Sequence, residues 1–141
     1  MAEGQKAEFN FVDFKAVKFS LDYTKDNDQS LAISLIPYGE YAESSADFKL
    51  RFEFVAYQEA VGIESPLIAS EIQANFKFSD GILFSDIPDY FYRNAIAIAY
   101  PYLRSFISTL TLQANAGLLV IPVMNLTNME GVFRQNSKKI E

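Results

Sequence analysis

The sequence predicts an α+β domain in which an antiparallel sheet comes first and helices follow. In the first half of the chain, apolar and polar residues alternate, which is typical of strands with one covered and one solvated face. From about residue 90 onward, apolar residues recur every three or four positions, as on a helix that packs on one side. The length of 141 residues suits a single domain. We therefore expect one domain, with the sheet in residues 1–79 and the helices in residues 80–141.

The first two strands are predicted in residues 9–23 and 31–36. The alternation of the first changes phase near residues 12–14, which predicts a β-bulge or a division into two short strands. The second is followed by Pro37, which cannot donate a hydrogen bond to a neighbouring strand. Proline there favours a sheet edge or the end of the strand. Residues 38–47 are expected to form a loop.

The third and fourth strands are predicted in residues 46–57 and 68–79. In the third, Phe48, Phe52 and Phe54 fall on one face and charged residues fall on the other. This alternation predicts a sheet with one apolar face, which the helical half of the chain must cover.

The long helix is expected within residues 90–116. Its apolar stripe comprises Tyr92, Ile96, Ala99, Leu103, Ile107, Leu110 and Ala114. Pro101 should kink this helix or begin a new one, so the main helix is expected from about residue 101 to residue 115. Gly117 suits a left-handed helix cap. An extended apolar run follows in residues 118–126.

A final helix is predicted after this run, opened by a capping box of Thr127 and Glu130. It is expected to fray into a solvated tail at residues 137–139.

The composition excludes several classes of function. The chain has no histidine and no cysteine, which removes the usual general base at neutral pH and the commonest zinc ligands. We therefore expect no enzyme, no metal and no cofactor. A formal net charge of −6 disfavours nucleic acid as a partner. The N-terminus is charged, and no apolar run approaches the ~18 residues of a membrane span, so we expect a cytoplasmic protein without membrane insertion.

The aromatic content and the helix pattern predict a contact with another subunit. The chain holds 13 Phe and 8 Tyr, more than a core of this size plainly needs. Tyr102, Phe106 and Leu112 lie off the main stripe of the long helix and, with Leu110, form the predicted oligomer interface. The alternative is a helix buried deeply within one monomer.

The sequence also carries a set of short motifs in one order along the chain: Glu71-Ile72-Gln73, Pro101-Tyr102-x-Arg104, Ile107-Ser108, Gly117 and Pro122-x-x-Asn125-Leu126. In kind and in order, these motifs resemble those of the SecB-type protein-export chaperones. The resemblance implies a four-stranded sheet, a long helix, a loop and a short helix. It also implies a homotetramer, a dimer of dimers, that binds unfolded preproteins without ATP.

The same resemblance suggests partners. In the family, the export motor ATPase docks on acidic residues of the exposed sheet face, and Glu71 is the residue at a matched position. Some relatives instead hold an aggregation-prone antitoxin, and the sequence leaves both roles open.

Candidate residues for a client-binding groove are apolar or aromatic but lie in segments that read as loops. They are Tyr38, Tyr41, Leu118, Leu119, Ile121, Val123 and Met124. Methionine and tyrosine suit surfaces that accept many partners. The alternative for residues 118–124 is ordinary packing on the sheet. Two other classes of function stay open: a small-ligand-binding or enzymatic α+β protein that uses Asp86, Asp89 or a tyrosine, and a structural protein that binds one folded partner.

Overall fold

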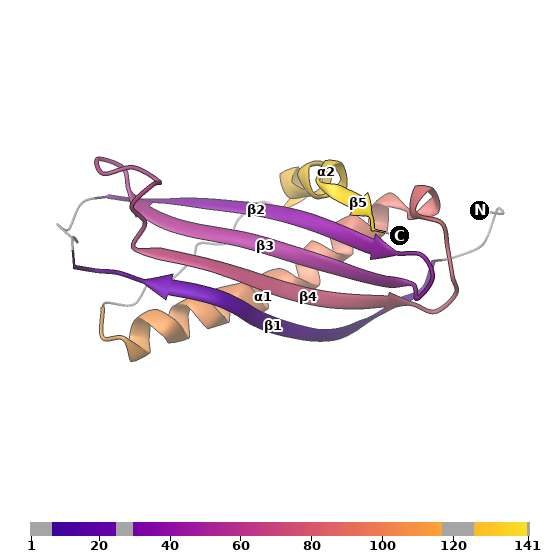
Figure 1. The fold of residues 1–141 in the computed structure, drawn as a ribbon, viewed down its shortest axis with the longest axis horizontal. Coiled ribbons are helices and arrows are strands. Elements are labelled where there is room, and N and C mark those ends of the chain that lie inside the picture. Colours follow the sequence, from indigo (N-terminus) through magenta and orange to yellow (C-terminus); the bar gives the residue numbers. More distant parts are fainter. Residues whose placement is uncertain (1–6, 25–29, 117–125, 141) are drawn as a thin grey trace.

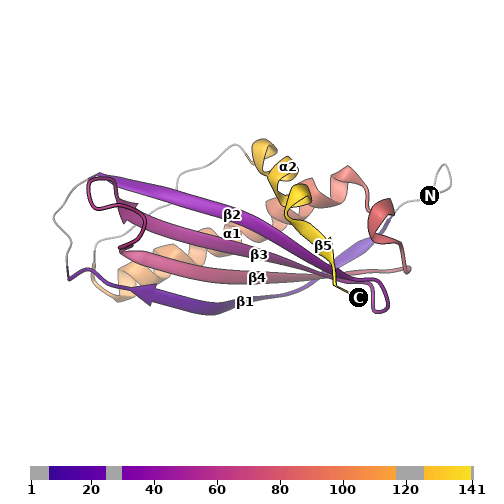
Figure 2. The same cartoon turned by 45° about the horizontal axis from the view of Figure 1, so that its top comes forward.

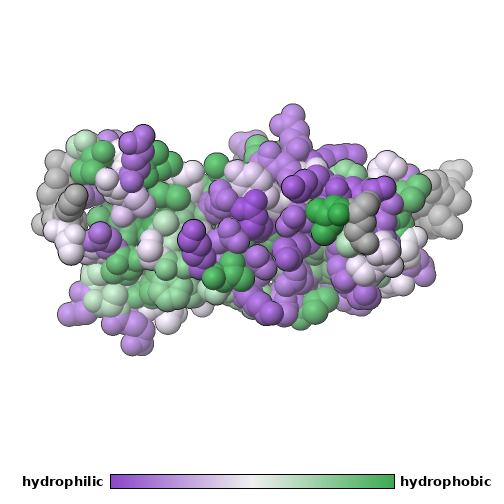
Figure 3. Space-filling model, viewed as in Figure 1, coloured by the Kyte–Doolittle hydropathy of each residue, from purple (hydrophilic) through white to green (hydrophobic). Residues whose placement is uncertain are grey.

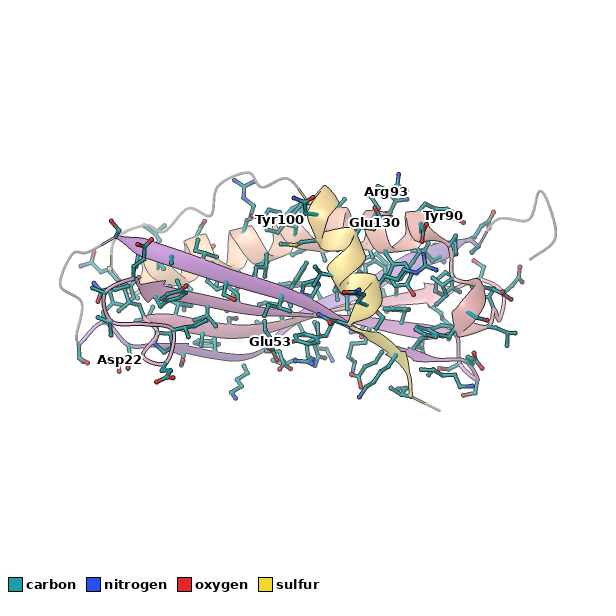
Figure 4. The ribbon with its side chains drawn as sticks, turned by 90° about the horizontal axis from the view of Figure 1, so that it is seen from above. Asp22, Glu53, Tyr90, Arg93, Tyr100 and Glu130 are labelled. Atoms are coloured by element: carbon teal, nitrogen blue, oxygen red, sulfur yellow. The ribbon has the colours of Figure 1, made fainter. Side chains whose placement is uncertain are left out.

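The computed structural model describes residues 7–24, 30–116 and 126–140 and shows two layers, a sheet with helices on one face (Figures 1 and 4). The predicted α+β class is confirmed. The elements in chain order are β1 (Phe9–Leu21), β2 (Leu31–Ala42), β3 (Asp47–Gln58), β4 (Ile68–Phe78), the 3-10 turn η1 (Phe84–Asp86), α1 (Asp89–Gln113), α2 (Thr127–Gln135) and β5 (Ser137–Lys139). Among these described residues the sheet order is β1-β4-β3-β2-β5. All neighbours are antiparallel except β2 and β5, which are parallel.

Two bulges in β1 keep its aromatic residues on the helical side of the sheet. The register with β4 shifts between Phe11 and Asp13 and again between Ala16 and Lys18. The phase change predicted near residues 12–14 is therefore confirmed, whereas the second bulge was not expected. The two skipped valines, Val12 and Val17, are exposed. Each bulge restores the side-chain alternation, because a one-residue slip exchanges the two faces of a strand.

The prediction of a loop at residues 38–47 is wrong, because β2 runs through Pro37 and pairs with β3 as far as Ala42. Residues 43–46 alone make the connection, with Ala46 in the left-handed region at φ 61°.

Pro37 is tolerated within β2 because β5 pairs only with Gly39 to Tyr41, so β2 is the edge strand of the described sheet at Pro37. The Pro37 carbonyl accepts a hydrogen bond from Asn136 Nδ2 at 3.1 Å, outside the ladder with β3. The proline nitrogen faces the same way, so no bond to β3 is lost. The prediction that Pro37 lies at a sheet edge is confirmed, whereas the prediction that it ends the strand is wrong.

The long helix begins twelve residues before Pro101, so the expected start at residue 101 is wrong. Pro101 removes one intrahelical donor, and burial of Phe91, Tyr92 and Ile96 in the first two turns offsets that cost. The helix also ends earlier than Gly117. Asn115 takes the left-handed conformation at φ 54° and donates to the Leu112 carbonyl. The next N–H donates to the Thr111 carbonyl, which completes a Schellman cap.

An aromatic cluster joins both helices to one end of the sheet. The Phe91 ring lies 4.9 Å from Phe9, 4.7 Å from Phe48 and 4.9 Å from Phe78 between ring centroids. Tyr92 extends the cluster to Phe133 of α2 at 5.2 Å, and burial raises the pKa of Tyr92 to about 12. Because these rings come from β1, β3, β4, α1 and α2, they fix the helical layer at this end.

The C-terminal segment differs from the prediction. The cap position of α2 is Leu126, which makes no side-chain cap hydrogen bond, so Thr127 does not stand at the position where the expected capping box would begin. Residues 137–139 are not a frayed tail but β5, which pairs with Gly39 to Tyr41 of β2. Arg93 to Glu130 and Arg134 to Asp89 are ion pairs between α1 and α2. Figure 2 shows α2 and β5 together beside β2.

The buried ring of Phe133 gives a stability prediction. Replacing Phe133 with Ala leaves a cavity against Phe48 and Tyr92 and should lower the free energy of unfolding by about 3–5 kcal/mol. The neighbouring Val132 is exposed, so Val132→Ala should change it by less than about 0.5 kcal/mol. Urea unfolding of both variants measures this, and equal effects would show that Phe133 does not anchor α2.

Candidate functional site

The helical layer covers the sheet unevenly. Helix α1 contacts β1 and β4, and α2 contacts β2 close to β5. Farther along β2, three alternate apolar side chains lie on the helical face without complete cover. We name Leu31, Ile33 and Leu35 the β2 strip. Leu31 is 38% exposed, and Ile33 and Leu35 are half-buried, whereas the paired face of β3 from Phe48 to Ala56 is buried throughout.

The backbone of the β2 strip faces an open edge. The Gly39 N–H donates to the Asn136 carbonyl at 3.2 Å, and the Tyr41 carbonyl accepts from the Ile140 N–H at 3.0 Å. Outward groups recur at every second residue of a strand, so those of Leu31, Ile33 and Leu35 point outward as well. No residue of the described chain pairs with these outward groups. Within the described ranges, the edge of β2 therefore has a half that is paired with β5 and a half along the β2 strip that is not paired, with Pro37 between them.

This arrangement can bind an extended polypeptide. Unpaired N–H and C=O groups on a sheet edge accept an added strand through main-chain hydrogen bonds, whatever its sequence. The neighbouring apolar side chains offer contacts to every second residue of that strand. The β2 strip combines both features, so it is the candidate functional site.

The two tyrosines predicted to line a groove do not share a surface. Tyr41 is fully buried in the aromatic cluster, where its hydroxyl donates to the Ile82 carbonyl at 2.8 Å. Burial raises the pKa of Tyr41 and removes its ring from any client, so its assignment to the groove is wrong for this structure. Tyr38 points to the opposite, open face, where the Arg51 guanidinium lies 4.4 Å from its ring centroid. The other candidates, Leu118, Leu119, Ile121, Val123 and Met124, lie outside the described residues.

Sequence reasoning missed the β2 strip as a site, although its signal was present. Leu31, Ile33 and Leu35 alternate with less apolar residues and precede Pro37, which marks an edge strand. An apolar face on an edge strand is less covered than the same face on a central strand. The length of α1 and its path over β1 and β4 then decide which part stays uncovered, and neither could be derived from the pattern of β2.

The open face of the sheet carries paired charges. The Arg51 guanidinium lies 2.5 Å from Glu53 and 3.5 Å from Glu71, so Glu71 is a partly exposed member of an ion-pair cluster. Figure 3 views this face: hydrophilic residues gather over the middle of the sheet and the half near β5, and hydrophobic ones at the opposite end. Figure 4 shows Glu53 on this face, opposite the helical layer that carries Tyr100, Arg93 and Glu130.

The predicted interface residues lie mostly along one flank, between α1 and β1. The Tyr102 ring lies 5.2 Å from both Phe11 and Phe14 and is 44% exposed. Phe106 contacts Phe19 of β1, which is itself exposed. Leu112 is exposed and Leu110 is half-buried. The flank carries several aromatic rings, a residue type that is enriched at protein interfaces.

Comparisons with known proteins identify the fold. A SecB-like chaperone from Mycobacterium tuberculosis, solved in complex with a peptide from the HigA1 antitoxin, superposes with a TM-score of 0.66. The match covers 83% of this chain and 88% of the other at 13% identity. A protein of unknown function from Streptococcus agalactiae matches with a TM-score of 0.53 at 9% identity, over 84% of this chain and 100% of that one. The chain therefore has the SecB-like fold, and the predicted resemblance is confirmed at the level of fold.

The comparisons of sequence match a smaller part of the chain than the comparisons of structure do. No family model matches the chain. An uncharacterised protein from Methanocaldococcus jannaschii is 38% identical over 52 residues, which is 34% of this chain. The match also spans 34%, about a third, of the length of that curated relative. In the described part of the chain, no helix is long and apolar enough to cross a membrane.

A carboxylate joins the paired half of the β2 edge to the connector before α1. Glu43 accepts a hydrogen bond from the Phe84 N–H at 2.8 Å, and Lys139 Nζ lies 3.2 Å from its carboxylate. The bond from Phe84, with the nearby Lys139 charge, lowers the pKa of Glu43 below its ordinary value of 4.5. The charged form of Glu43 therefore stabilises the fold above pH 4.5, and that contribution is lost as the pH falls through the folded-state pKa.

Replacing Glu43 with Gln tests this linkage. The variant should be less stable than the unchanged protein at pH 7, and the difference should shrink as the pH falls below 4.5. Denaturant unfolding at a series of pH values measures it. Glu64→Gln, at an exposed position, serves as the control. A stability difference that stays constant from neutral to acid pH would contradict the role given to the Glu43 charge.

Proposed function

We propose that this protein is an ATP-independent holdase chaperone that binds unfolded polypeptides as extended segments along the β2 strip. The observation that carries the proposal is the edge of β2 beside Leu31, Ile33 and Leu35, whose outward main-chain groups have no partner in residues 7–24, 30–116 and 126–140. An unfolded chain has free main-chain groups and exposed apolar side chains. The edge of β2 can pair with the main-chain groups and the β2 strip can contact the side chains, without requiring a particular sequence. The SecB-like fold supports the proposal, since a protein of that fold was solved with an antitoxin peptide bound.

One such site would bind weakly. Each large apolar side chain buried from a client contributes about 1.5–3 kcal/mol. Association costs roughly 4–15 kcal/mol, so three contacts and a few strand hydrogen bonds leave only a small surplus. Weak single contacts permit release without ATP, and several linked sites can raise the overall affinity by about 10²–10⁴.

We propose that the linked sites come from a homotetramer, a dimer of dimers. The proposed subunit contact comprises Tyr102, Phe106, Leu110 and Leu112. The rings of Tyr102 and Phe106 pack beside β1, and Leu112 is exposed on the same helix. The apolar run of residues 118–124 is a proposed further part of the client site.

The client is proposed to be an unfolded preprotein or an antitoxin. For the export role, Glu71 on the open face is the proposed contact for the motor ATPase, on the side of the sheet opposite the client. The small-ligand alternative is less well supported. The aromatic cluster fills the space between α1 and the sheet at one end, and Asp86 and Asp89 are exposed, with Asp89 paired to Arg134.

A double substitution in the β2 strip tests the proposed function. Leu31→Ser with Ile33→Ser should weaken binding of an unfolded, reduced and carboxymethylated protein by about tenfold or more, because two apolar contacts are lost. Leu83→Ser with Val132→Ser is the matched control, since both residues are exposed and lie outside the strip.

Binding is measured by fluorescence anisotropy of the labelled client, and circular dichroism verifies that both variants fold. If the strip variant folds and binds as the control does, the β2 strip is not the client site. If the unchanged protein ignores unfolded chains, the holdase proposal itself is wrong.

A further inference from the structure

The strand β5 occupies the same edge that the client is proposed to use. It pairs with Gly39 to Tyr41, whereas the β2 strip begins a few residues earlier on the same strand. In Figures 1 and 2, β5 lies along β2 toward the end of the strand marked by the C-terminus. Thus β5 already does, within the chain, what an added client strand would do.

Fewer and weaker tertiary contacts stabilise the position of β5 than stabilise the position of α2. The side chains of Lys138 and Lys139 are exposed, so β5 buries little apolar surface. Its contacts are main-chain hydrogen bonds, the bond from Ser137 Oγ to the Phe133 carbonyl and the partly exposed ion pair of Lys139 with Glu43. Phe133, in contrast, is fully buried. Opening at Asn136 would therefore release β5 while α2 stays anchored.

Pro37 and Asn136 mark the boundary between the two halves of the edge. Asn136 satisfies the Pro37 carbonyl and the Gly39 N–H, which are the first outward groups beyond the β2 strip. A client strand on Leu31 to Leu35 would meet Asn136 and β5 if it continued. Release of this segment would free the Pro37 carbonyl, the Gly39 N–H and the Tyr41 carbonyl for the client.

We propose that β5 is an exchangeable strand that regulates the client site: while it is paired, it limits the client to Leu31–Leu35, and on release it yields the edge as far as Tyr41 to the client. This inference rests on the proposed function and adds an internal competitor to it. It predicts that client affinity depends on whether β5 is free to leave.

A reversible crosslink tests the exchange in one protein. The chain has no cysteine, and Glu40 pairs with Lys138 in the register of β2 and β5, so Glu40→Cys with Lys138→Cys can join the strands on oxidation. A second variant ends at Gln135, so it lacks both β5 and Asn136, which satisfies the Pro37 carbonyl and the Gly39 N–H. The probe is labelled α-lactalbumin that has been reduced and carboxymethylated, so that the client itself has no free thiol.

The expected order of affinity is the shortened chain, then the reduced double-cysteine protein, then its oxidised form. The first and last should differ by about tenfold, because a few main-chain hydrogen bonds are exchanged. Equal affinity in all three forms would overturn the regulation by β5 and leave the holdase proposal standing. Absence of binding in every form, including the unchanged protein, would overturn the proposed function and the inference with it. A shortened chain that forms a larger assembly than the unchanged protein on light scattering, without gaining affinity, would show that the freed edge takes a second copy instead, against the inference.

Discussion

The aromatic cluster around Phe91 is the constraint on which the rest of the structure depends. Rings from β1, β3 and β4 surround Phe91, and Tyr92 carries the contact on to Phe133. These side chains bury large apolar areas in tilted and edge-to-face pairs, which fix positions more narrowly than aliphatic packing does. The cluster therefore fixes the first turns of α1 and the whole of α2 at one end of the sheet.

The opposite end of the molecule follows from that anchoring. With α2 held by Phe133, its cover of β2 is confined to the part next to β5, and α1 packs on β1, β4 and, through Phe91, on Phe48 of β3. The β2 strip is left partly open, beside main-chain groups that no described residue pairs. The aromatic cluster, which stabilises the fold, and the β2 strip, which is proposed to bind clients, therefore lie at different ends of the sheet.

The sequence was most informative where one physical rule dominated. Alternation fixed β3 and β4, and the phase change in β1 located the first bulge, because a slip exposes aromatic residues. Prediction failed where tertiary contacts outweighed a local rule. Pro37 ends no strand because its nitrogen faces the edge, and Pro101 ends no helix because Phe91 and Tyr92 are buried before it. Tyr41 was predicted to lie in a loop because Pro37 was expected to end the second strand. Strand β5 could not be found from Ser137-Lys138-Lys139, since its partner is more than ninety residues away.

Hydrogen exchange of individual β2 amides, with and without an unfolded client, tests the central claim most directly. The outward amides of Leu31 and Ile33 should exchange fast in the free protein and become protected in the complex, since a client strand would accept their hydrogen bonds. The inward amides of Ala32 and Ser34 face β3 and serve as internal controls. If the client adds a strand to β2, protection should be confined to the outward amides. A bound client that leaves those amides exchanging as before would contradict it.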